Sequence, residues 1–109
     1  MYSRHMTFQI KKSAVSEFPQ IIEKELLPLL RTQTGFLDEV ILVAPDKPEG
    51  VAISLWEKKE FADNYTRDFY PEAAKIMNKY IEGMPVVKTF EVGYATLPKF
   101  EKFATVAHN

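Results

Sequence analysis

The sequence of 109 residues has no cysteine, a single tryptophan, two histidines and no long apolar run. The missing cysteines exclude disulfide bonds, thiolate nucleophiles and thiolate metal sites, and they are compatible with a reducing compartment. No apolar stretch approaches the roughly 18 residues that a membrane span requires, and the first ten residues do not show the pattern of a secretory leader. We therefore expect a soluble, cytoplasmic protein.

An excess of positive charge is also missing, because 14 basic and 15 acidic residues are interleaved along the chain. Without a basic stripe we expect no nucleic-acid and no membrane partner. His5 and His108 stand at opposite ends of the sequence, and the carboxylates fall in helical surface patterns, so we expect no metal site. The motifs of nucleotide binding and of familiar hydrolases do not occur either.

What is present is a composition of 46% hydrophobic and 27% charged residues, which is typical of one folded domain of this length. In residues 2–10 mainly apolar side chains alternate with polar ones, which predicts a strand with one apolar and one polar face. Residues 36–44 and 51–57 are β-rich and are separated by a turn rich in proline and glycine, which predicts a hairpin. Residues 86–94 alternate again and predict a last strand.

Two segments between these strands have apolar residues at three- and four-residue steps, which predicts two helices with one buried face each. The first is expected to end at about Thr32, and the second to run from about Lys59 to Gly83. Pro28 lies inside the first and Pro71 inside the second, so we expect the first to bend or restart and the second to consist of two pieces.

The order β-α-β-β-α-β predicts an α+β, ferredoxin-like antiparallel sheet with both helices on one face. The two middle strands carry too many apolar residues for the other face to be wet, namely Leu37, Ile41, Val43, Val51, Ile53 and Leu55. A second sheet would cover that face, so we expect a homodimer through the sheet face, a dimeric α+β barrel. The alternative is a monomer docked on another protein. The domain is placed at residues 1–96, and residues 97–109 form a C-terminal tail assigned to packing on the partner subunit.

A family resemblance rests on Pro28-Leu29-Leu30 followed by Gly35-Phe36, then on Leu55-Trp56-Glu57 before an aromatic helix. Over about residues 6–94 the chain resembles the antibiotic biosynthesis monooxygenase (ABM) domain. The resemblance implies a pocket between the helices and the sheet. Some members use this pocket to oxidise fused aromatic phenols with O₂ and no cofactor, and others use it to hold and degrade haem.

The haem-degrading members of that family use an asparagine on the first strand, the tryptophan that ends the third strand and a histidine on the second helix. This chain keeps the tryptophan as Trp56, but it has Met6 near the first position and Lys75 or Ile76 near the last. Because an axial ligand is missing, we expect no haem. Since the motifs of nucleotide binding are absent too, we expect no cofactor.

The predicted substrate-binding residues are aromatic and would wall a slot for a flat ring: Trp56, Phe36, Tyr65, Phe69 and Tyr70. No catalytic residue is assigned, and Asn64, Arg67 and His5 are the candidates for orienting or deprotonating a phenol. Structural alternatives stay open for all of them. Trp56, Tyr65 and Phe69 are also suited to core packing, and Tyr70 to stacking on Pro71; Asn64 and Arg67 suit a solvated helix face, and His5 the dimer barrel.

Two functional hypotheses follow from these patterns. One is a cofactor-independent monooxygenase-like protein that acts on a small aromatic or quinone-like molecule, which the aromatic residues around Trp56 and the family resemblance favour. The other is a non-catalytic dimer of the same fold that binds a small apolar molecule or has a structural role. The absence of a convincing acid, base or ligand set favours the second.

Overall fold

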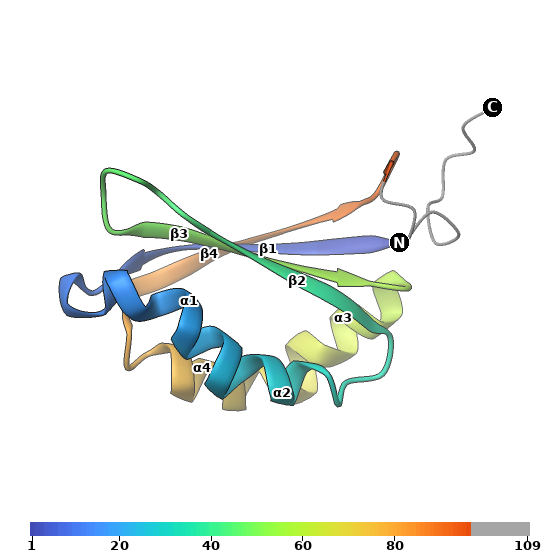
Figure 1. The fold of residues 1–109 in the computed structure, drawn as a ribbon. Helices are drawn as coiled ribbons and strands as arrows, with labels where there is room; N and C mark the ends of the chain where they lie inside the picture. The colour runs from blue at the N-terminus through green and yellow to red at the C-terminus, as the bar shows by residue number, and fades with distance from the viewer. Residues whose placement is uncertain (97–109) are drawn as a thin grey trace.

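A computed structural model describes residues 1–96 of the chain, and the predicted tail at residues 97–109 lies outside the described residues. The four strands are β1 (Tyr2–Ile10), β2 (Phe36–Val43), β3 (Glu49–Trp56) and β4 (Ile81–Glu91). They form one antiparallel sheet in the order β2-β3-β1-β4, and the helices lie against one of its faces (Figure 1). The predicted α+β, ferredoxin-like order is therefore confirmed.

The helical segments between β1 and β2 are η1 (Lys12–Glu17), α1 (Phe18–Ile21), η2 (Ile22–Leu26) and α2 (Leu27–Leu30). Those between β3 and β4 are α3 (Lys59–Asn64), η3 (Tyr65–Phe69) and α4 (Tyr70–Met77). Both η2 and η3 are single wide turns of π-helix that directly precede the Leu27-Pro28 and Tyr70-Pro71 pairs. Proline has no N–H and its ring crowds the preceding turn, so the helix widens there. The predicted interruptions are confirmed.

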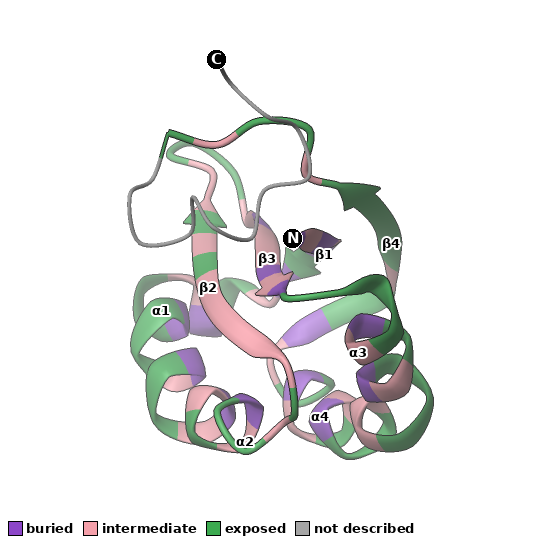
Figure 2. Cartoon of the chain, turned by 90° about the vertical axis from the view of Figure 1, so that its right-hand side faces the viewer, coloured by how far each residue is buried: buried purple, intermediate pink, exposed green. Residues whose placement is uncertain are grey.

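The core lies between the sheet and the helices, where the buried stripes of the helices turn inward (Figure 2). Phe18, Ile22, Leu26 and Leu30 follow a four-residue spacing and are at most 4% exposed. They pack under Phe8 of β1, whose ring lies 5.2 Å from that of Phe18. Gly50 is buried opposite Phe8. A Cβ atom at this position would lie 2.9 Å from the Phe8 ring, so only glycine leaves room for that ring.

Gly83 does not end the second helix, so that prediction was wrong. The helix ends at Met77, and Gly83 lies inside β4 with a φ of 68°. The register of β4 against β1 shifts between Thr7 and Gln9, and Gly83 and Pro85 fall within that shift. Glycine accepts the positive φ that the irregular strand requires, and proline is tolerated on an edge strand. The last strand consequently begins earlier than the predicted residue 86.

Candidate functional site

The five predicted substrate-binding residues form one connected chain of rings between the helices and the sheet. Phe36 meets Trp56 edge to face at 5.6 Å, and Trp56 lies 5.0 Å from Tyr65. Tyr65 then contacts Phe69 at 6.0 Å and Tyr70 at 6.3 Å. Trp56 is fully buried and its indole N–H donates to Ser54 Oγ at 2.9 Å, so it packs in the core. A role for these rings in binding a substrate stays a prediction.

The wide turn η3 determines how Tyr65 and Tyr70 face the sheet. The backbone N–H of Tyr70 donates to the carbonyl of Tyr65, five residues earlier. In a regular α-helix, side chains five residues apart diverge by about 140° around the axis, whereas a π-turn brings them closer together. Both rings therefore meet the same group on β1, the guanidinium of Arg4.

A row of polar residues crosses the helix-covered face of the sheet at this point. Glu39 of β2 pairs with Ser54 of β3, Ser54 with Arg4 of β1, and Arg4 with Thr89 of β4. Residues directly opposite in antiparallel strands place their side chains on the same face. The neighbouring row on one side is apolar, since it contains Ile41, Ala52, Met6 and Val87. We call Glu39, Ser54, Arg4 and Thr89 the polar row.

Arg4 is the buried charge of the polar row, with 5% of its surface exposed. Its Nε donates to Thr66 Oγ1 at 3.0 Å, and the Thr66 hydroxyl in turn donates to the carbonyl of Ala62. Its Cζ lies 4.6 Å from the centre of the Tyr70 ring and 5.4 Å from that of Tyr65. Arg4 has no ion-pair partner within residues 1–96. The two rings and one hydroxyl hold it in place.

Glu39 stands at the β2 end of the polar row, where burial raises the pKa of its carboxyl group to about 7, with a smaller contribution from Asp38. Burial also raises the pKa of the Tyr65 hydroxyl to about 12; the charge of Arg4 acts against that shift, and the charge of Glu39 adds to it. Tyr65 therefore stays protonated at neutral pH, whereas Glu39 can gain or lose a proton there. The polar row combines a fixed cation with a carboxyl group that titrates near pH 7.

Two hollows open next to these residues. A groove of about 350 Å³ lies between α4 and β4, and its lining includes Tyr70, Met84, Pro85 and Val87. A smaller hollow of about 140 Å³ is lined in part by Phe61, Asn64 and Tyr65. The groove has the volume of a small-ligand site and the hollow does not. Tyr70 both lines the groove and contacts the guanidinium of Arg4.

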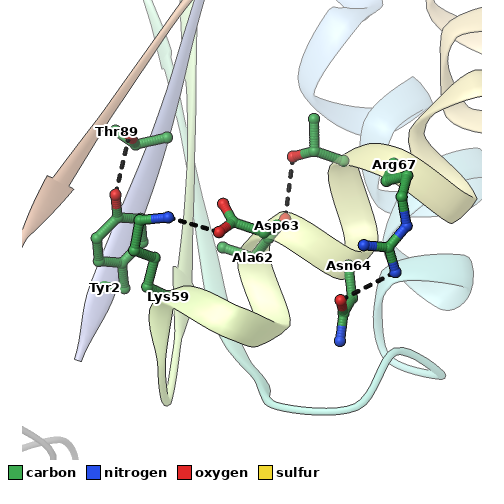
Figure 3. A network of polar contacts seen from close by, with 8 residues as sticks. Tyr2, Lys59, Ala62, Asp63, Asn64, Arg67 and Thr89 are labelled. Atoms are coloured by element: carbon green, nitrogen blue, oxygen red, sulfur yellow. Dashed lines mark hydrogen bonds and ion pairs between the residues drawn. The ribbon is translucent and has the colours of Figure 1, made fainter.

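Asn64 and Arg67, two of the candidates for handling a phenol, contact each other on the helix surface (Figure 3). Arg67 Nη2 donates to Asn64 Oδ1 at 3.0 Å, and the guanidinium also pairs with Asp68 at 2.7 Å. Asp68 holds the pKa of Arg67 above its usual range, and Arg67 lowers that of Asp68. Arg67 is exposed and Asn64 is half-buried at the rim of the smaller hollow.

His5, the third candidate, lies on the other face of the sheet, as the alternation of β1 indicated. Its ring meets Phe90 edge to face at 5.0 Å, and Nε2 lies 3.2 Å from Ser3 Oγ. The structure thus separates His5 from the aromatic rings by the full thickness of the sheet.

Arg4 and Glu39 were not identified as site residues from the sequence, although a signal was present. Arg4 alternates in phase with Met6, Phe8 and Ile10, so a charge was visible on a face predicted to be buried. Glu39 is in phase with Ile41 and Val43 in the same way. A charged residue at a position where the alternation predicts a buried apolar side chain is the pattern that would have identified Arg4 and Glu39.

Within residues 1–96, no group of three His, Asp or Glu side chains is placed to hold a metal ion. In the same part of the chain, no helix is long and apolar enough to cross a membrane.

Comparison with solved structures finds the same fold in proteins of low sequence identity. The cofactor-independent oxygenase SnoaB from Streptomyces nogalater has a TM-score of 0.69 and 18% identity, covering 89% of this chain and 96% of its own. The monooxygenase from ActVA-Orf6 of Streptomyces coelicolor, in complex with nanaomycin D, has a TM-score of 0.68 and 18% identity over 89% and 91%. A putative antibiotic biosynthesis monooxygenase from Deinococcus radiodurans has a TM-score of 0.68 and 13% identity over 87% and 95%.

No family model and no curated protein matches the sequence. The likeness is therefore one of structure, at identities where sequence alone gives no match. The fold that the family resemblance implied is confirmed: the chain has the ferredoxin-like fold of the antibiotic biosynthesis monooxygenase proteins.

Proposed function

We propose that this protein is a cofactor-independent monooxygenase-like enzyme that acts on a small aromatic or quinone-like molecule. The observation that carries the proposal is the chain of rings from Phe36 to Tyr70, which ends at a groove of about 350 Å³ and contacts Arg4 of the polar row. The structural neighbours described as a cofactor-independent oxygenase and as a monooxygenase in complex with nanaomycin D support it.

The chemistry of such a reaction asks little of the protein. A phenol that loses its proton supplies the electrons itself: with O₂, one oxygen atom enters the ring para to the hydroxyl and the other leaves as water, which gives a quinone. The protein binds the ring, accepts the phenol proton and excludes water. Glu39 is the group of the polar row that can accept this proton at neutral pH, because burial raises its pKa to about 7.

The test is oxygen uptake with a panel of polycyclic phenols, using the wild type and Glu39→Gln. We expect uptake with at least one phenol and a loss of about 100-fold or more in kcat for the variant, the usual effect of removing a general base. Asp38→Asn is the matched control, since it neutralises the adjacent carboxylate, which the strand register places on the opposite face. Flat traces with every phenol despite binding would contradict the enzyme and favour the non-catalytic binding protein.

We further propose that a second copy of the chain covers the open face of the sheet. In register on that face lie Val40 and Leu42 of β2 and Val86 and Phe90 of β4, which are between 45% and 57% exposed. These residues lie on the two edge strands of the sheet. Large exposed apolar side chains gathered on one face are typical of an interface, and a face that packs on its own copy gives a closed dimer.

A further inference from the structure

We propose that Arg4 is an anion-binding residue, and that the ligand of this site is a flat aromatic molecule carrying an ionised oxygen, such as the enolate of a hydroxyquinone. This inference rests on the proposed function and narrows its substrate class. Nothing in the sequence patterns or in the structural neighbours assigns a role to Arg4.

The first argument is the unused hydrogen-bonding capacity of Arg4. A guanidinium has five N–H donors, and a charge that is 95% buried is normally paired with a carboxylate. Here Nε donates to Thr66, and the two terminal nitrogens have no hydrogen-bond or ion-pair partner among residues 1–96. Removing this charge from water without an ion pair is costly, so the site favours an anion that can supply the missing acceptors.

The terminal nitrogens are also accessible. No side-chain nitrogen or oxygen in the described part of the chain is both fully enclosed and without a hydrogen bond. Since the terminal nitrogens of Arg4 have no such bond, neither is fully enclosed, and both keep some solvent-accessible surface. An acceptor oxygen of a ligand would contact them at that surface.

The second argument is the position of Arg4 next to the groove. Val87, which lines the groove, pairs with Met6, and the next helix-facing pair along the same two strands is Arg4 with Thr89. Two residues along a strand span about 7 Å, which is the scale of two fused rings. Tyr70 lies between Arg4 and the groove, and its hydroxyl donates to Met6 Sδ at 3.2 Å.

The third argument is the nature of the walls. The rings of Tyr65 and Tyr70 both face the guanidinium of Arg4, and Tyr70 also lines the groove. Aromatic walls favour a flat, apolar ring, and one guanidinium matches one negative oxygen. An ionised hydroxyquinone has both features in one molecule.

The test uses two isomers, 2-hydroxy-1,4-naphthoquinone and 5-hydroxy-1,4-naphthoquinone. They have the same size and formula, but at pH 7 the first is ionised and the second is neutral. The protein has no cysteine that would react with either quinone. Binding of both to the full chain is measured by calorimetry. We expect the wild type to bind the ionised isomer at least about tenfold more tightly, as for a charge-assisted hydrogen bond.

Arg4→Gln is expected to lower this preference to about one without weakening the neutral isomer, because the shape of the walls is kept. Arg31→Gln is the control, since it makes the same chemical change at an exposed position at the end of α2. If Arg4→Gln does not fold, Arg4→Lys is measured instead; it keeps the charge without the planar fork, and a several-fold loss of preference is expected.

The outcomes separate the two proposals. Equal binding of the isomers by the wild type, or a preference that survives in folded Arg4→Gln, overturns the anion site and leaves the proposed function standing. Binding of neither isomer overturns both, because the aromatic slot itself would then be absent.

Discussion

Each face of the sheet contains a group of residues that departs from the usual distribution of polar and apolar side chains. The face covered by helices carries the charged and polar row of Glu39, Ser54 and Arg4, of which Ser54 and Arg4 are about 95% buried. The face without helices carries apolar side chains, among them Leu42 and Phe90, that are about half exposed. Burial normally favours the opposite arrangement.

The two proposals above would account for both departures. A buried charge without an ion pair is tolerated where a ligand supplies the missing partner, and an exposed apolar row is tolerated where a second surface covers it. Under the two proposals above, the covered face would bind a small molecule and the open face would bind a second copy of the chain. Each of the following changes tests one side of this comparison.

The largest effect is expected for Trp56→Ala on the covered face. Trp56 has no exposed surface and contacts the rings of Phe36 and Tyr65, so truncation leaves a cavity that costs about 3–5 kcal/mol of unfolding free energy. Urea denaturation followed by circular dichroism measures this cost. Trp56→Phe keeps most of the volume and should lose less than half as much; equal losses for both would show that ring packing is not the cause.

Glu39→Gln is expected to change how stability depends on pH. The folded state raises the carboxyl pKa from 4.5 to about 7, so between these values the folded state binds more protons than the unfolded state. Wild-type stability therefore falls as pH rises from about 4.5 to 7, by on the order of 3 kcal/mol. Glutamine cannot ionise, so the variant should be the more stable protein at pH 8.

Unfolding free energies at pH 5 and pH 8 provide the measurement for Glu39→Gln. Asp38→Asn is again the comparison, because it removes the neighbouring carboxylate and keeps Glu39, so the pH dependence should persist. A wild-type protein whose stability is flat between these two pH values would contradict the burial of the Glu39 charge.

Leu42→Lys tests the open face. A charge within an apolar interface must be desolvated, so the dissociation constant of the proposed dimer should rise at least tenfold, or about 1.4 kcal/mol. Sedimentation equilibrium measures the change. Met84→Lys is the control: Met84 is 92% exposed but lines the groove on the other face, so the dimer should persist. A wild-type protein that is monomeric at micromolar concentration would contradict the proposed dimer.

The smallest effect is expected for Arg67→Ala, outside both faces. Arg67 is exposed and pairs with Asp68 and Asn64 on the helix surface, where ion pairs contribute little. Stability should change by no more than about 0.5 kcal/mol, and binding of hydroxynaphthoquinones should be unchanged. A loss of ligand binding comparable to that of Arg4→Gln would indicate that the ligand binds at the smaller hollow and not at Arg4.

Local patterns in the sequence were sufficient for the order of elements, because alternation and helical spacing are properties of neighbouring residues. The aromatic cluster followed from the same spacing, with Tyr65 and Phe69 on one helical stripe. The site around Arg4 did not follow, since its hydroxyl partner, Thr66, is 62 residues away and nothing local pairs them. Pro71 signalled an interruption, but proline alone does not distinguish a kink from a widened turn.

The widened turn η3 also fixes the relative phase of the two halves of its helix. The five residues Tyr65–Phe69 advance the helix by about as much as four residues of a regular helix, so the same five residues in regular turns would rotate everything that follows by about 100° around the axis. Ala73 and Met77 would then leave the core or Tyr65 would leave Arg4, because the two halves could not both keep their contacts. The wide turn therefore keeps both halves in phase, and in related chains a one-residue deletion should be tolerated within Tyr65–Phe69, where it leaves a regular turn, but not in the regular turns of α3 and α4.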